Sequence, residues 1–168
     1  EVVCPAPYFV EYGFYVSNFG ATLVPVPSRE FTFELDIAAL DAAIGPRTRA
    51  VLVNSPNNPT GQVYRREELG QLAEVLQRRS EEHGRPIFLV SDEPYRFLTY
   101  GGISVPPLLP LYPYSVVAGS FSKNLSLAGE RVGYIVANPA AAGVDELLAG
   151  MVLTNRILGF VNAPAVGQ

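Results

Sequence analysis

Cysteine, histidine and tryptophan are almost missing from this sequence of 168 residues, which has one cysteine, one histidine and no tryptophan. The single Cys4 has no partner within the chain for a disulfide. A lone histidine leaves no Cys/His spacing that would indicate a metal site, so no metal is expected. No apolar run reaches the ~20 residues of a membrane-spanning helix, and no membrane partner is expected. These absences favour a reducing, cytoplasmic location.

Basic residues are also scarce. Twelve Lys and Arg face sixteen Asp and Glu, and they are scattered singly or in pairs. No basic face is therefore available for a phosphate backbone, and nucleic acid is not an expected partner. A hydrophobic fraction of 48% is enough for one compact core, which predicts a single domain over residues 1–168. Because the sequence starts without Met in what resembles the middle of a strand, we expect a fragment of a longer protein.

Short apolar runs alternate with longer periodic segments, which predicts an α/β fold with a mostly parallel sheet sandwiched by helices. Expected strands are 2–4, 22–26, 50–54, 87–91, 115–119 and 132–137, and expected helices are 8–19, 36–45, 65–82 and 140–153. The helix at 65–82 has the clearest pattern, with Leu69, Leu72 and Leu76 on one face. Between residues 100 and 113, the density of Pro and Gly predicts a loop.

Three polar clusters follow predicted strands, at 54–61, 92–95 and 120–123. Ligands of open α/β sheets bind at the carboxyl ends of parallel strands. We therefore expect the three clusters to meet in one site.

Lys123 is the candidate nucleophile of this site. It follows an apolar strand among Ser, Asn and Phe, where partial burial would lower the pKa of its ammonium group and let the amine form an imine. The alternative is a solvated lysine at a strand end. Arg131, together with Ser120 and Ser122, supplies donors suited to a phosphate dianion. A salt bridge to a nearby acid, Glu130 or Asp145, is the alternative role for the arginine.

Asp92 is the candidate acid, because a carboxylate at the mouth of a buried strand can keep a pyridine nitrogen protonated. The alternatives are a turn or capping role, or Glu93 as the functional acid. Tyr95 and Asn58 can both donate to a phenolic oxygen in the same pocket. Asn58 lies in a segment of turn composition, and by itself this segment predicts only a loop. Phe9 can stack on a flat heterocycle, although such a ring is more often part of the core.

In this order, the clusters resemble the class I/II aminotransferases, which are fold-type-I enzymes dependent on pyridoxal phosphate. Three motifs carry the resemblance: Asn-Pro-Thr-Gly at 58–61, Asp-x-x-Tyr at 92–95, and Ser-x-Ser-Lys followed by Gly-x-Arg-x-Gly at 120–133. The sequence around Lys123, together with Asn155, Arg156 and residues 160–164, is similar to the sequences of bacterial enzymes labelled aspartate aminotransferase. The resemblance covers nearly the whole chain, as the central part of that family's large domain. It places the family's N-terminal phosphate loop before Glu1 and its small C-terminal domain after Gln168.

The resemblance implies a role for each candidate residue. Lys123 would form the Schiff base with pyridoxal 5′-phosphate, and Asp92 would pair with the pyridinium nitrogen. The other implied contacts are Tyr95 and Asn58 on the ring oxygen, Phe9 on the ring face, and Ser120, Ser122 and Arg131 on the phosphate.

The implied activity is the transfer of an amino group between an amino acid and a 2-oxo acid by a cytoplasmic homodimer. We expect the 168-residue chain alone to be inactive, because the residues that orient the substrate lie outside it. The same lysine and cofactor also serve C–S lyases, decarboxylases and synthases. A pyridoxal-phosphate-sensing domain of a transcription regulator is a further alternative.

Overall fold

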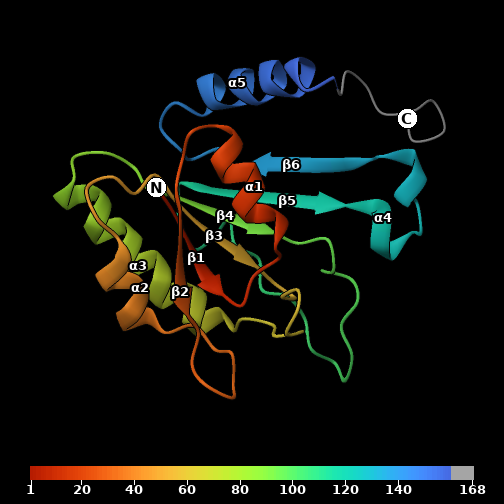
Figure 1. Ribbon diagram of the computed structural model, residues 1–168, viewed down its shortest axis with the longest axis horizontal. Helices are drawn as coiled ribbons and strands as arrows, with labels where there is room; N and C mark the ends of the chain where they lie inside the picture. The colour runs from red at the N-terminus through yellow and green to blue at the C-terminus, as the bar shows by residue number, and fades with distance from the viewer. Residues whose placement is uncertain (160–168) are drawn as a thin grey trace.

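The computed structural model describes residues 1–159, which form one six-stranded sheet flanked by helices (Figure 1). Its strands are β1 (Val2–Ala6), β2 (Leu23–Pro27), β3 (Ala50–Asn54), β4 (Phe88–Asp92), β5 (Ser115–Ser120) and β6 (Gly133–Ala137). Their order across the sheet is β2-β1-β3-β4-β5-β6. The first five strands run parallel and β6 runs antiparallel to β5. The predicted mostly parallel sheet is confirmed.

The helices are α1 (Glu11–Asn18), α2 (Ile37–Ala43), α3 (Arg66–Glu82), α4 (Phe121–Asn124) and α5 (Val144–Ile157), with a 3-10 turn η1 (Ala128–Glu130). Right-handed crossovers place α1 on one face of the sheet and α2 and α3 on the other. Figure 1 shows α2 and α3 side by side, apart from α1, and α5 beyond β6. Within residues 1–159, no helix is both long and apolar enough to span a membrane.

The main core lies between the sheet and the pair α2 and α3. Val51 and Leu89 on central strands are fully buried, as are Leu72 and Leu76 on α3. The loop before β5 closes the same side, because Tyr112 donates a 2.9 Å hydrogen bond to the Ile87 carbonyl. Burying these apolar faces on one side of the sheet fixes which side chains of each strand point into the core.

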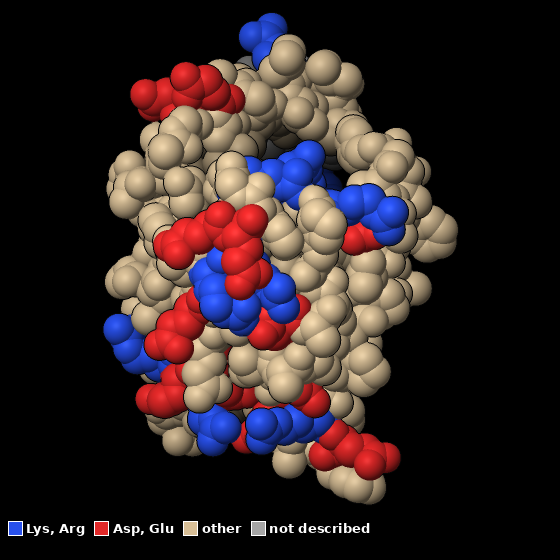
Figure 2. Space-filling model, turned by 90° about the vertical axis from the view of Figure 1, so that its left-hand side faces the viewer, with Lys and Arg blue, Asp and Glu red and all other residues tan. Residues whose placement is uncertain are grey.

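The outer surface of α2 and α3 is charged but mixed in sign. Arg78 and Arg79 of α3 both pair with Asp41 of α2, at 2.6 and 2.7 Å. Figure 2 shows basic and acidic side chains interspersed over this side of the molecule. These ion pairs link the two helices on the side away from the sheet.

Several predicted boundaries shift in the structure. Strands β4 and β5 each end one residue later than predicted, so Asp92 and Ser120 are their last residues. The last helix begins at Val144 rather than 140, because Gly143 before it takes a left-handed conformation with φ 76°. The first helix begins at Glu11 rather than 8, since the preceding residues form a turn. The short helix α4 was not predicted.

We expect Leu72→Ala to lower the free energy of unfolding by about 3 kcal/mol, because the side chain is fully buried against the sheet and its loss leaves a cavity. Urea denaturation measures the change. The matched control is Gln71→Ala, one residue away on the exposed face of α3, which we expect to change stability by less than about 0.5 kcal/mol. Equal losses in the two variants would contradict the described packing of α3.

Candidate active site

The carboxyl ends of β3, β4 and β5 lie side by side. Asn54 at the end of β3 is in register with Asp92, which in turn is in register with Ala118 of β5. A cavity of about 190 Å³ opens at this edge, lined by Phe9, Tyr12, Asn54, Asn58, Asp92, Pro94, Tyr95 and Lys123. The structure therefore brings together five of the predicted site residues from four separate segments.

Asn54 ties two of these segments together. Its Nδ2 donates to the Asp92 carbonyl at 2.8 Å, and its Oδ1 accepts the Asn58 backbone N–H at 2.6 Å. The turn continues with Gly61, which takes a left-handed conformation with φ 77° that glycine adopts without strain. The amide of Asn58 lies 3.4 Å from the Tyr95 hydroxyl, so both groups face the same part of the cavity. They remain the predicted pair of donors to a ring oxygen.

The Asp92 carboxylate is bound by a phenol. Tyr12 of α1 donates its hydroxyl to Asp92 Oδ2 at 2.6 Å. Burial raises the pKa of Asp92 above its ordinary value of 3.8, and the hydrogen bond from Tyr12 partly offsets this rise. Burial, followed by the charge of Asp92, raises the pKa of Tyr12 far above its usual range. The phenol therefore stays protonated and available as a donor.

Glu93, the alternative acid, points away from the cavity. It is only 3% exposed, and its Oε1 accepts a 2.9 Å hydrogen bond from Ser91 Oγ. Its Oε2 forms an ion pair with Arg96. Since its charge is already paired and it does not line the cavity, the geometry favours Asp92 over Glu93.

Lys123 lies on the helical turn α4, directly after β5. The turn is capped by Ser120, whose Oγ accepts the Ser122 backbone N–H at 3.1 Å. The lysine Nζ lies 5.9 Å from the centre of the Tyr95 ring, within reach of a cation–π interaction. The prediction that Lys123 is partly buried is wrong. Its side chain is exposed, and none of the residues of α4 is buried.

The predicted phosphate ligands do not line the cavity. Ser120 donates to Ser122 Oγ at 2.9 Å, so the two hydroxyls are adjacent. Arg131 is exposed, has φ 55°, and donates to the Ala128 carbonyl at 3.0 Å. Within residues 1–159 it forms no ion pair, which removes the alternative role of a salt bridge. The phosphate role of these three residues stays a prediction.

Tyr12, Asn54 and Pro94 line the cavity without having been predicted. Tyr12 follows Phe9 by three residues, and their rings meet edge to face at 5.6 Å. That spacing was a usable signal for a second aromatic in the site. Asn54 opens the polar cluster at 54–61, so its position was also a signal. Composition was a further signal for the site as a whole, since Lys123 is the only lysine in the sequence.

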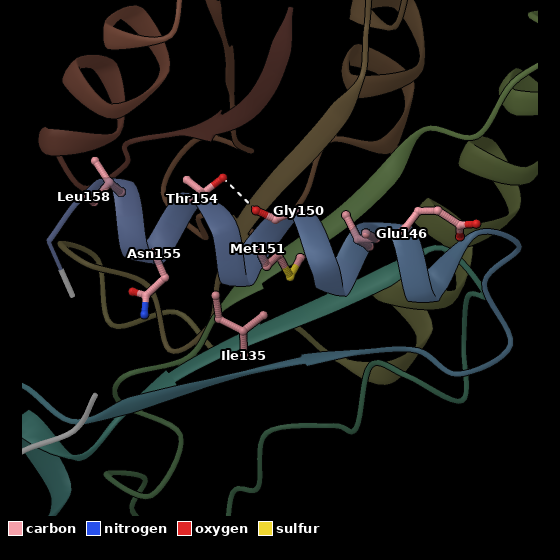
Figure 3. Close-up of a pocket in the computed structure, with 8 residues that line it drawn as sticks. Ile135, Glu146, Gly150, Met151, Thr154, Asn155 and Leu158 are labelled. Carbon is pink, nitrogen blue, oxygen red and sulfur yellow. Dashed lines mark hydrogen bonds between the residues drawn. The ribbon is translucent and has the colours of Figure 1, made fainter. Parts of the chain in front are cut away.

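A larger cavity of about 480 Å³ lies elsewhere, between α5 and β6 (Figure 3). Ile135 and Met151 lie on facing sides of this cavity, and Thr154 donates to the Gly150 carbonyl on the helix at 2.8 Å. Apart from Glu146, no titratable side chain of the described residues lines it. This larger cavity contains none of the predicted site residues. The strand-end cavity is therefore the candidate active site.

Comparisons with known proteins show the family of the chain. The chain matches the family described as aminotransferase class I and II over residues 1–167. It is 40% identical over 156 residues to an aspartate aminotransferase of Geobacillus stearothermophilus, covering 90% of this chain and 37% of that protein. It is 33% identical over 141 residues to an aromatic-amino-acid aminotransferase of Thermococcus litoralis, covering 82% of this chain and 35% of that protein.

A crystal structure of an aminotransferase from Eubacterium rectale superimposes with a TM-score of 0.94 at 44% identity. The match covers 97% of this chain and 41% of that one. The chain thus spans less than half the length of the relatives it matches. Residues 160–164, whose sequence contributed to the resemblance, lie outside the described residues.

The raised pKa of Asp92 predicts that Asp92→Asn stabilises the ligand-free protein at pH 7. The folded state binds this proton more tightly than the unfolded state, so the carboxyl group lowers stability as the pH rises above 3.8 through its folded pKa. An asparagine carries no such penalty, and the advantage of the variant should shrink as the pH falls toward that window.

Thermal unfolding of the ligand-free protein between pH 4.5 and 7 measures this difference. Asp145→Asn, at an exposed position in the first turn of α5, is the control and should show no such pH-dependent gain. A variant at position 92 that is less stable than the wild type at pH 7 would contradict the prediction.

Proposed function

Because this chain belongs to the class I and II aminotransferases, we propose that the protein containing it transfers an amino group between an amino acid and a 2-oxo acid, using pyridoxal 5′-phosphate. One observation carries the proposal. Lys123, Asp92 and Asn58, which come from three different strand ends, line one cavity together with Tyr95. An amine, a carboxylate and two donors are the set of groups that this cofactor requires.

The residues that line the cavity fit the aldehyde, the ring nitrogen and the ring oxygen of the cofactor. The Lys123 amine would hold its aldehyde carbon, and the Asp92 carboxylate would pair with its ring nitrogen. Asn58 and Tyr95, whose polar atoms are 3.4 Å apart, would both donate to the ring oxygen. Phe9 would lie against the ring, and the phosphate would be held by Ser120, Ser122 and Arg131. When bound, the cofactor supplies an electron sink for the negative charge that develops on the amino acid Cα.

The chain's own residues then divide the work. The negative charge of Asp92, held in place by the Tyr12 phenol, would keep the ring nitrogen of a bound cofactor protonated. The Nζ of Lys123 would act as the base that removes the proton from the amino acid Cα. Its position beside the Tyr95 ring keeps it at the cavity.

The finer assignments are also proposals. The relatives named above act, by their names, on aspartate and on aromatic amino acids, so aspartate is the first donor to test, with 2-oxoglutarate as the acceptor. We further propose that the full-length protein is a cytoplasmic homodimer, as the family resemblance implies.

Reductive trapping tests the lysine directly. We expect the full-length protein to develop cofactor absorbance on incubation with pyridoxal 5′-phosphate, and borohydride to fix the cofactor on the tryptic peptide that contains Lys123. Since Lys123 is the only lysine of this sequence, a modified peptide from within it is unambiguous. Lys123→Ala should show neither the absorbance nor the modified peptide. A wild-type protein that stays colourless, or one modified only outside residues 1–168, would refute the proposal.

Replacement of the acid tests the electron sink. We expect Asp92→Asn to keep the bound cofactor but to lower kcat by at least roughly two orders of magnitude, because the ring nitrogen loses its charged partner. The matched control is Glu93→Gln, which removes the neighbouring buried carboxylate outside the cavity and should leave kcat per folded molecule within a few-fold of the wild type. A larger loss in the control than in Asp92→Asn would assign the role to Glu93.

The products identify the reaction. Formation of a 2-oxo acid together with pyridoxamine phosphate is the expected result for a transaminase. Ammonia and pyruvate would instead identify a lyase that uses the same lysine and cofactor.

A further inference from the structure

We infer that Tyr12 is a positioning residue of the proposed site: its phenol holds one oxygen of the Asp92 carboxylate and leaves the other oxygen for the ring nitrogen of the cofactor. This inference rests on the proposed function. It concerns a contact between residues 80 positions apart, which joins α1 to the end of β4.

Within residues 1–159, a hydrogen bond reaches only one of the two oxygens of the Asp92 carboxylate. Oδ2 accepts the Tyr12 hydroxyl at 2.6 Å, a length typical of an O–H donor bound to a charged carboxylate. No other side chain within residues 1–159 donates to this carboxylate. Both residues line the same cavity, so Oδ1 is the oxygen that remains for a ligand.

The tyrosine is held firmly. Its side chain is only 5% exposed. The Phe9 ring meets it edge to face at 5.6 Å, and the Tyr8 ring lies nearly parallel to it at 6.5 Å. With aromatic neighbours on two sides, the phenol has little freedom to leave the carboxylate.

The hydrogen bond acts on the charge of Asp92. Burial favours the neutral acid, whereas a donor favours the carboxylate, and Tyr12 is the donor that opposes burial. A neutral acid at this position would not keep a pyridine nitrogen protonated. Removing the phenol hydroxyl should therefore move the shared proton from the ring nitrogen toward Asp92.

Tyr12→Phe in the full-length holoenzyme tests this role, because it removes one oxygen and keeps the ring. We expect the ¹⁵N signal of a ring-labelled cofactor to shift toward the value of neutral pyridine, and kcat to fall about 10- to 100-fold with little change in KM. The matched control is Tyr15→Phe on the same helix, whose hydroxyl bonds Glu11 rather than Asp92 and which should leave both readouts unchanged. In an Asp92→Asn background, Tyr12→Phe should cause no comparable further loss.

A purely structural role gives a different result. Tyr12→Phe would then lower the melting temperature without moving the ¹⁵N signal, and this outcome would overturn the inference. Additive losses with Asp92→Asn would overturn it as well. If Tyr12→Phe does not fold, Tyr12→His retains a ring with an N–H donor; a protonated ring nitrogen in this variant supports the inference, and a neutral one opposes it. A wild type that binds no cofactor would refute the proposed function itself, and is thus a separate failure.

Discussion

The in-register parallel pairing of β3, β4 and β5 is the constraint on which the site depends. This register places the end residues Asn54 and Asp92 opposite each other. It is maintained by the apolar side chains that pack on α3, such as Leu89. Because side chains alternate along a strand, a slip of one residue in β4 would turn Asp92 into the core and bring Glu93 to the cavity. The hydrophobic core thus decides which carboxylate is available for chemistry.

The two adjacent acids illustrate how the chain separates stability from function. Glu93 is fully buried and satisfied by Ser91 and Arg96, so it supports the fold. Asp92 has one bonded oxygen and a pKa raised mainly by burial, so its charge is held in a setting that disfavours it. Groups retained in such a setting are characteristic of functional sites. The same dipeptide serves both needs because its members point to opposite sides of the strand end.

Much of the fold could be predicted from periodicity, and the site from its strand ends. The amphipathic pattern of Leu69, Leu72 and Leu76 gave α3 within a residue, and the polar clusters gave four of the predicted cavity residues. Contacts between distant segments could not be predicted, because no local pattern encodes the meeting of Tyr12 with Asp92. The exposure of Lys123 was also mispredicted, since burial depends on what packs over α4 rather than on its neighbours in sequence. The phosphate-binding role of Ser120, Ser122 and Arg131 stays a prediction.

The Asn54 side chain has a mechanical consequence. Its Nδ2 donates to the Asp92 carbonyl and its Oδ1 accepts from the Asn58 N–H, so it connects the turn after β3 to the last residue of β4. A ligand that pulls on Asn58 therefore also pulls on the strand that carries Asp92. Asn58 and Asp92 would contact a bound ring from two sides. The spacing between these two residues would therefore be fixed before any ligand binds.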